Sequence, residues 1–188
     1  MGRWQPNARG RLLEAAMELF AERGYEQTTV GEIAKRAGLT ERTFFRHYAD
    51  KREVLFGGAQ EMRELFTRTL AGLPASAGPM EAVGATLAAV AEGFRDRHAF
   101  ARHRQALIAA NAELRERELI KLADLSATVA GALRERGVGE PAASLAAEAA
   151  IAVFRVAFER WTRSPGTREL GLYMEESLVE LKAVTAGA

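Results

Sequence analysis

Two arginines, Arg42 and Arg46, stand four residues apart in a segment that also carries Phe44 and Tyr48. On a helix that advances about 100° per residue, Tyr48 lies about 40° from Phe44, and the arginines lie about 160° and 200° from it. Such a helix is anchored by its aromatic face and presents both guanidiniums outward. Because arginine forms paired hydrogen bonds with guanine edges and with phosphate, this face is suited to reading a nucleic acid.

Other side chains near these arginines could contact the sugar-phosphate backbone. Thr43 flanks the outward face and can bond phosphate or touch a thymine methyl group, and Phe45 flanks the same face. Thr29 stands at a predicted helix start, where its hydroxyl and the nearby backbone N–H groups favour phosphate. Lys51 begins the next predicted helix and could clamp the backbone from there. Residues 1–11 form either a basic arm that reaches the DNA or a disordered basic terminus.

The segment that holds these residues has the pattern of two short helices joined by a tight turn. Thr29 and Glu32 form a capping box, Gly38 suits the turn, and Thr40 can cap the second helix. This order is that of a helix-turn-helix, whose second helix enters the major groove of DNA. From the spacing alone, an ordinary helical hairpin with a solvated basic face remains an alternative.

Helical signals extend over the whole chain, because Ala, Leu, Glu and Arg are abundant and few windows alternate as strands do. The sequence predicts an all-α fold of about nine helices. A three-helix domain over 1–50 precedes a helical domain over 51–188. A capping pattern at Asp50 predicts a fourth helix to about Leu70, in which Gly57 could mark a bend. The remaining longer helices are predicted at 10–23, 80–96, 98–110, 113–136, 142–163 and 167–184.

The segment from Leu12 to Leu55 resembles the N-terminal domain of TetR-family transcriptional regulators. The resemblance is carried by Leu12, Ala15-Ala16, Leu19-Phe20, Gly24, Thr28-Thr29-Val30, Ile33-Ala34, Ala37-Gly38-Leu39-Thr40, Thr43-Phe44-Phe45, His47-Tyr48, Lys51 and Leu55. It implies a homodimeric repressor that binds a near-palindromic operator and has a helical effector domain.

Within the resemblance, two positions depart from the usual residue. Family members often carry tyrosine where this chain has Phe45, and a small residue where it has Arg42. His47 and Lys51 align with family phosphate contacts. The DNA-binding residues expected from pattern and resemblance together are Thr29, Thr40, Arg42, Thr43, Phe45, Arg46, His47 and Lys51.

The resemblance implies that residues 56–188 hold a small-molecule pocket. The region from 113 to 161 is loosely similar to family members proposed to sense acyl-CoA-like ligands, so an apolar or amphiphilic effector is expected. Aromatic residues at helical spacing are also common in an ordinary core, which remains the alternative. The candidate pocket residues are Met62, Phe66, Phe94, Phe100, His103, Phe154, Phe158 and Trp161.

The last two long helices are the expected dimer interface, where two helices from each subunit would make a four-helix bundle. The same residues could instead pack within one subunit. The residues expected at the interface are Ala149, Ala150, Val153, Ala157, Leu170, Met174, Leu178 and Leu181.

The charge of the chain is segregated. The 188 residues include 26 Lys and Arg against 25 Asp and Glu, for a formal net charge of +1. Residues 1–11 carry a net +3 and residues 35–52 a net +4, which leaves −6 for the rest of the chain. Because attraction to phosphate depends on the local field, a near-neutral total is compatible with a DNA-binding face.

The composition also limits other functions. The chain has no cysteine and no Glu-x-x-His motif of a helical di-iron site, and His98 and His103 are too far around a helix to share a metal. No metal, cofactor or catalytic residue is predicted, and the protein is not expected to be an enzyme. No apolar run could cross a bilayer and no export signal is visible, so a cytoplasmic location is expected. An all-helical enzyme or carrier and a helical interaction protein remain alternatives.

Overall fold

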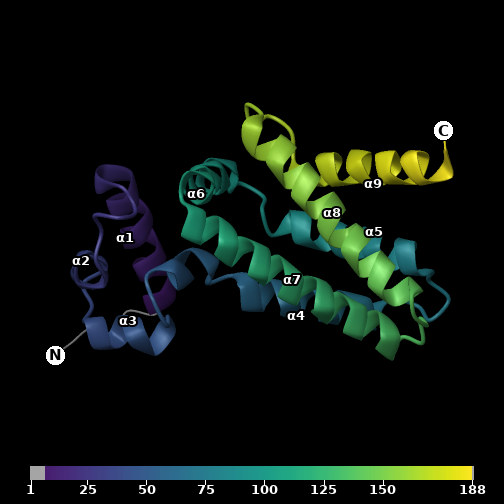
Figure 1. Ribbon diagram of the computed structural model, residues 1–188, viewed down its shortest axis with the longest axis horizontal. Helices are drawn as coiled ribbons and strands as arrows, with labels where there is room; N and C mark the ends of the chain where they lie inside the picture. The colour runs from purple at the N-terminus through teal and green to yellow at the C-terminus, as the bar shows by residue number, and fades with distance from the viewer. Residues whose placement is uncertain (1–6, 188) are drawn as a thin grey trace. The chain divides into compact units, whose positions relative to one another are not determined.

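A computed structural model describes residues 7–187, and within that range it contains nine α-helices, one 3₁₀ helix and no strand (Figure 1). The prediction of an all-α fold is therefore confirmed. None of the helices in the described range is long and apolar enough to span a membrane. The α-helices are α1 (Ala8–Arg23), α2 (Val30–Arg36), α3 (Glu41–His47), α4 (Ala59–Gly72), α5 (Pro79–Glu92), α6 (His98–Ala110), α7 (Ala112–Glu135), α8 (Ala142–Arg163) and α9 (Leu170–Ala186).

The chain forms two compact units. The first unit contains the described residues up to Ala59 together with Ala106–Glu118, and the second contains Gln60–Gln105 and the residues from Leu119 onward. These ranges differ from the predicted division at residue 50. The first unit extends past residue 50 because Val54, Leu55 and Phe56 are buried in its core, and it includes Ala106–Glu118 because Ile108 and Leu114, at the junction of α6 and α7, are fully buried in the same core.

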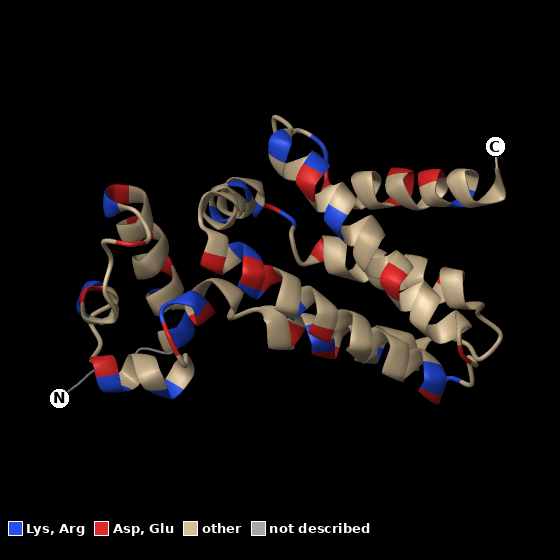
Figure 2. Cartoon of the chain, viewed as in Figure 1, with Lys and Arg blue, Asp and Glu red and all other residues tan. Residues whose placement is uncertain are grey.

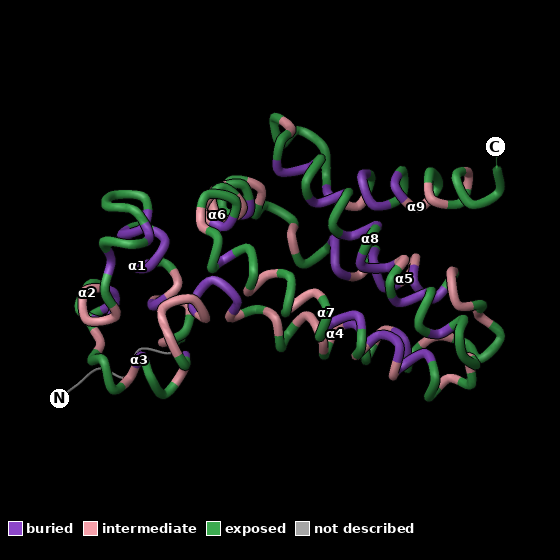
Figure 3. Tube along the Cα trace, in the orientation of Figure 1, coloured by how far each residue is buried: buried purple, intermediate pink, exposed green. Residues whose placement is uncertain are grey.

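Helices α1, α2 and α3 form the body of the first unit, and their buried residues, purple in Figure 3, make up most of its core. Leu12 of α1, Ile33 of α2 and Phe44 of α3 each have no exposed surface. Large apolar side chains buried in this way are the main source of stability in a small helical unit. The core therefore fixes the orientation of α3 and, with it, the face that α3 turns to solvent.

The two short helices begin as the capping pattern predicts. The Thr29 hydroxyl accepts a hydrogen bond from the Glu32 N–H at 3.3 Å, and the Glu32 carboxylate accepts one from the Thr29 N–H at 2.9 Å. The Thr40 hydroxyl accepts a hydrogen bond from the Thr43 N–H at 3.2 Å at the start of α3. Gly38 has a φ of +65°, the left-handed conformation that glycine adopts without steric cost, so the chain turns sharply between the helices.

The predicted fourth helix is interrupted. Asp50 accepts hydrogen bonds from the backbone N–H groups of Arg52 and Glu53 and starts a 3₁₀ helix, η1 (Arg52–Phe56), which ends before α4 begins. A Cβ atom on Gly57 would lie 2.9 Å from the Tyr48 hydroxyl. The break thus lies where the chain passes close to the end of α3, and a Cβ at this position would force the Tyr48 ring to shift.

The second unit is built around α5, α8 and α9, which contact one another pairwise. Its core contains a row of small residues on α8, among them Ala143, Ala147, Ala150 and Ala157, each with no exposed surface. Small side chains at such positions allow close approach of neighbouring helices.

Candidate nucleic-acid interface

The two arginines of α3 lie on its solvent face. Arg42 and Arg46 are exposed, whereas Phe44 and Tyr48 are buried in the core of the first unit. The helical spacing therefore predicts correctly which side of α3 faces inward. Figure 2 marks the basic residues on the chain, including those at both ends of α3.

Most other arginines around α2 and α3 are neutralised by carboxylates. Arg36 bonds Glu22 at 2.8 Å and Glu18 at 3.0 Å, and it holds the pKa of Glu22 below its ordinary value. Within the described residues, Arg42 and Arg46 have neither an ion pair nor a hydrogen bond. Their donors are therefore available to an external anion. Further arginine pairs of this unit include Arg23 with Glu32, Arg52 with Asp50 and Arg117 with Glu53.

Arg9 packs against other residues of the first unit and is not part of a free N-terminal arm. Its guanidinium donates a hydrogen bond to the Gly57 carbonyl at 3.2 Å and lies 5.6 Å from the centre of the Tyr48 ring. The Tyr48 hydroxyl in turn donates to the Arg9 carbonyl at 3.3 Å. These contacts join the start of α1 to the end of α3. Arg3, the most N-terminal arginine, lies outside the described residues.

Lys51 is held against the loop that follows α1. Its ammonium donates a hydrogen bond to the Tyr25 carbonyl at 2.7 Å and lies 4.1 Å from the centre of the Tyr25 ring. An ammonium has three N–H donors, so this bond fixes its position and leaves donors for a second acceptor. The role of Lys51 as a phosphate contact stays a prediction.

The threonines place hydroxyl groups at the starts of both helices. Thr29 and Thr40 are exposed at the N-termini of α2 and α3, and the Thr40 and Thr43 hydroxyls lie 3.1 Å apart. The Thr29 hydroxyl and N–H both donate to the Glu32 carboxylate at 2.9 Å, so a phosphate would have to displace that carboxylate, whereas the exposed Thr40 hydroxyl at the start of α3 is a suitable donor for phosphate. Their contacts with DNA likewise stay predictions.

His47 ends α3 in a half-buried position. Its Nε2 atom is buried and has no hydrogen-bond partner among the described residues. Burial lowers the pKa of His47 below its ordinary value of 6.5, and the nearby cations Arg46 and Arg9 lower it further. The neutral imidazole is therefore favoured in the folded protein.

The lowered pKa of His47 predicts a pH dependence of stability. As the pH falls below 6.5, the unfolded chain binds a proton at His47 before the folded chain does, so the free energy of unfolding decreases until the pH passes the folded pKa. Well above pH 6.5, His47 is neutral in both states and adds no pH dependence to the free energy of unfolding. Denaturant unfolding at pH 7.5 and 5.5 should show a smaller loss of stability in His47→Gln than in the wild type. Equal losses in the two proteins would contradict this assignment.

In the second unit, most of the predicted pocket residues lie in one core. Phe66, Phe154, Phe158 and Trp161 are buried, and Met62 and Phe94 are half-buried against the same cluster. Phe100 is exposed and His103 is half-buried, and neither belongs to the cluster.

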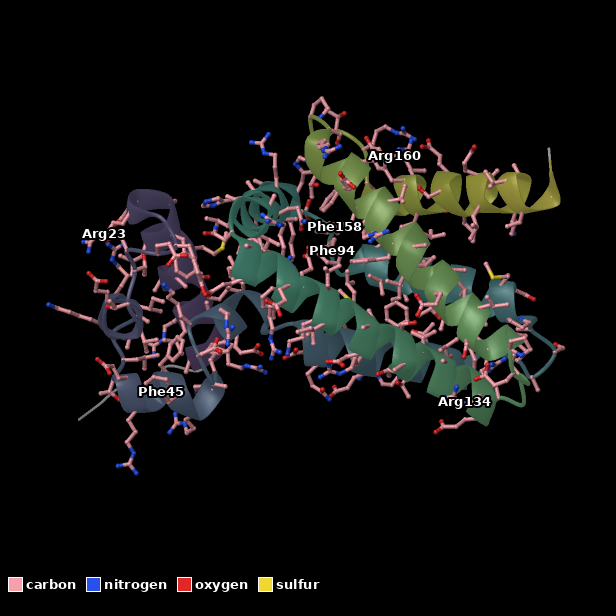
Figure 4. All side chains as sticks on the ribbon, viewed as in Figure 1. Arg23, Phe45, Phe94, Arg134, Phe158 and Arg160 are labelled. Carbon is pink, nitrogen blue, oxygen red and sulfur yellow. The ribbon has the colours of Figure 1, made fainter. Side chains whose placement is uncertain are left out.

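The aromatic members of this core touch one another. The Phe94 and Phe158 ring centres are 5.3 Å apart, and those of Phe154 and Phe158 are 5.5 Å apart in a stacked arrangement (Figure 4). Trp161 also packs on Phe94, and the His98 ring bonds the Trp161 carbonyl. A ligand that entered here would have to separate these rings.

The residue assignment within the predicted dimer interface is corrected by the structure. Five of its members are buried against other helices of the same chain: Ala150, Val153, Ala157, Leu170 and Met174. They therefore cannot form a second, outward surface. The exposed large apolar residues of the same two helices are Leu145 and Val156 of α8 and Leu172, Val179 and Val184 of α9.

The segment at the α6–α7 junction is a part of the first unit that the sequence pattern does not reveal. Arg117 of α7 forms an ion pair with Glu53 of η1, and Leu114 is buried beside it in the same core. These contacts join residues more than 50 positions apart in the chain, and local periodicity carries no signal for such pairs.

Comparison with known proteins identifies related sequences and folds. Residues 12–56 match the family described as bacterial regulatory proteins, tetR family, and residues 77–186 match the MftR C-terminal domain. The chain is 40% identical over 88 residues to the transcriptional regulator TcmR of Streptomyces glaucescens, and the aligned segment covers 47% of this chain and 39% of TcmR. It is 36% identical over 94 residues to the transcriptional repressor KstR2 of Mycobacterium tuberculosis, and this alignment covers 48% of this chain and 46% of KstR2. The chain thus spans less than half the length of these two relatives.

A solved structure is similar over nearly the whole chain. Thermus thermophilus FadR, a TetR-family repressor in complex with lauroyl-CoA, has a TM-score of 0.55 and 27% identity over 93% of each chain. The proteins found by sequence and by structure are transcriptional regulators and not enzymes.

Proposed function

Because the chain belongs to the TetR family of bacterial transcriptional regulators, we propose that it is a homodimeric repressor whose operator complex dissociates when a small effector binds the second unit. The observation that carries the DNA-binding part is the pair of exposed arginines on α3, Arg42 and Arg46, which have no partner within the described residues. The surrounding arginines Arg36 and Arg52 are neutralised by carboxylates of the same unit. A cytoplasmic location follows from this proposal, since the bacterial chromosome lies there.

A dimer would place one α3 helix in each of two major grooves of a near-palindromic operator. The spacing of the two half-sites would be about 34–36 Å or a multiple of it. Arg42 and Arg46 then read base edges or phosphate, and Thr29, Thr40, Thr43, His47 and Lys51 contact the backbone. The exposed apolar residues of α8 and α9 form the subunit contact.

The effector is proposed to be an apolar or amphiphilic molecule of the acyl-CoA class. The FadR structure with lauroyl-CoA supports this class. The site would lie among Phe94, Phe154 and Phe158, whose rings separate when the ligand enters. An effector changes DNA binding only if its affinity differs between the two states of the protein, so ring separation must favour the state that does not fit the operator.

The proposal is tested by selecting duplexes from a random DNA pool with the full-length protein. An enriched inverted repeat, bound as a discrete complex in a mobility-shift assay, is the expected result. Lauroyl-CoA at micromolar concentration should release that complex, whereas coenzyme A alone should not. A pool without an enriched sequence would contradict the DNA-binding function. An operator complex that lauroyl-CoA does not release would contradict the effector class.

Removal of either exposed arginine should weaken operator binding. Arg42→Ala and Arg46→Ala should each reduce the affinity by about 1–3 kcal/mol if the arginine contacts a base edge. Affinity for random DNA at the same salt concentration should fall less. Fluorescence anisotropy titration measures both values. The control is Arg68→Ala, an exposed arginine of α4 in the second unit, which should bind as the wild type does. Unchanged affinity in both α3 variants would contradict the orientation of α3.

A further inference from the structure

Phe45 is an exposed aromatic residue of α3 that flanks the face carrying the two arginines. Its side chain is 55% exposed, and among the described residues of the first unit it is the one large apolar side chain that lies open to solvent. The neighbouring Phe44 has no exposed surface. A single exposed apolar residue is common on protein surfaces and does not by itself indicate a contact. Whether Phe45 makes a contact therefore has to be inferred from the residues around it.

These surroundings hold the ring in place beside free cationic groups. The Phe45 ring packs edge-on against Phe44, with 5.6 Å between ring centres and 80° between planes. Arg42 precedes it by three positions and Arg46 follows it directly, and both guanidiniums are exposed. On a helix that advances about 100° per residue, Phe45 lies about 60° from Arg42 and about 100° from Arg46, so contact of the arginine face with DNA would bring the ring to the edge of the same contact. Figure 4 labels Phe45 on α3.

The chemistry of the ring limits what it can recognise there. A phenyl group has no hydrogen-bond donor, so contact with a phosphate oxygen would remove water from that oxygen without replacing its hydrogen bond. The apolar group that the floor of the major groove presents is the 5-methyl group of thymine. Burial of this methyl against an aromatic ring is favourable and specific to one base.

We propose that Phe45 reads the 5-methyl group of one thymine in each operator half-site. This inference rests on the proposed DNA-binding function and adds a base-specific contact to it. The position would then supply sequence discrimination, and the arginines on either side would supply attraction to phosphate and guanine.

Uracil substitution tests this contact without changing any Watson–Crick pair. The probe is the duplex enriched from the random pool by the full-length protein, made in versions that replace each thymine in turn with deoxyuridine. One thymine per half-site should be sensitive, and loss of its methyl should weaken wild-type binding about fourfold per contact, the effect of exposing one buried methyl. Equal binding to all versions would overturn the inference.

Variants of α3 show which side chain is responsible. In Phe45→Ala the sensitive thymine and its uracil version should bind equally, and in Phe45→Leu part of the difference should remain. Thr43 also carries a methyl group on this face, so Thr43→Ser, which keeps the hydroxyl, is the matched control and should retain the full uracil penalty. Loss of the penalty in Thr43→Ser, or its persistence in Phe45→Ala, would overturn the assignment to Phe45.

The two levels of the proposal fail in different ways. A pool from which no sequence is enriched would overturn the DNA-binding function and this inference with it. An enriched operator that is bound tightly, with the same affinity for every deoxyuridine version, would overturn only the role of Phe45.

Discussion

Replacement of Phe44 with alanine is expected to destabilise the first unit by about 3–5 kcal/mol, the usual effect of truncating a fully buried phenylalanine. Phe44 has no exposed surface, and its ring contacts those of Phe45 and Tyr48. The cavity left by its removal would lie directly beneath the basic face of α3. Operator binding should be lost together with the ordered structure of this helix.

Hydrogen exchange locates this effect. In Phe44→Ala, amides of α2 and α3 should exchange much faster than in the wild type, while those of α8 in the second unit should keep their protection. The matched control is Phe45→Ala, whose side chain is mostly exposed and whose stability should change by no more than about 0.5 kcal/mol. Equal destabilisation by the two neighbouring substitutions would contradict the described burial.

Replacement of Val156 with glutamate is expected to weaken the proposed dimer by about 3 kcal/mol, a factor of roughly 100 in the dissociation constant. Val156 is 47% exposed and lies on one face of α8 with Leu145 and Ala152, eleven and four positions earlier. On a helix these three positions fall within about 40° of one another, so they form one apolar stripe. A carboxylate at this position of the stripe would be buried without a partner when two subunits meet.

Sedimentation equilibrium measures the dimer dissociation constant directly. Ala127→Glu, an equivalent change at an exposed position of α7, is the control and should leave it unchanged. Because a monomer engages only one half-site, Val156→Glu should also lose most operator affinity while its helix content stays the same. A Val156→Glu protein that dimerises as the wild type does would show that the subunit contact lies elsewhere.

The sequence predicts those features that depend on neighbouring residues. The capping box at Thr29 and the inward orientation of Phe44 both follow from spacing over a few residues, and the structure confirms both. The family model matched to residues 12–56 coincides closely with the segment identified from its motifs.

Features that depend on distant contacts could not be predicted in this way. At the interruption, Gly57 lies close to Tyr48, and no local pattern records that contact. The neutralisation of Arg36 by Glu18 and Glu22 requires the packing of α1 against α2. For the same reason, the sequence could not distinguish the paired arginine from the unpaired Arg42 and Arg46.

Helix α8 has two apolar faces, and the sequence pattern does not distinguish the inward face from the outward one. Ala150, Val153 and Ala157 were expected at a dimer interface, but they face the core of their own chain. An apolar helix that packs on both sides has two apolar faces, and its periodicity alone does not say which face meets which partner. Exposure in the folded chain is what identifies Leu145 and Val156 as the outward residues.

The central claim is that α3 is a sequence-specific DNA reader, and one titration tests it most directly. The full-length protein is titrated with the selected operator and with a scrambled duplex of equal length and composition, at one salt concentration. We predict that the operator binds at least about 1,000-fold more tightly, the lower end of the range for specific DNA-binding proteins. Equal dissociation constants for the two duplexes would contradict the claim.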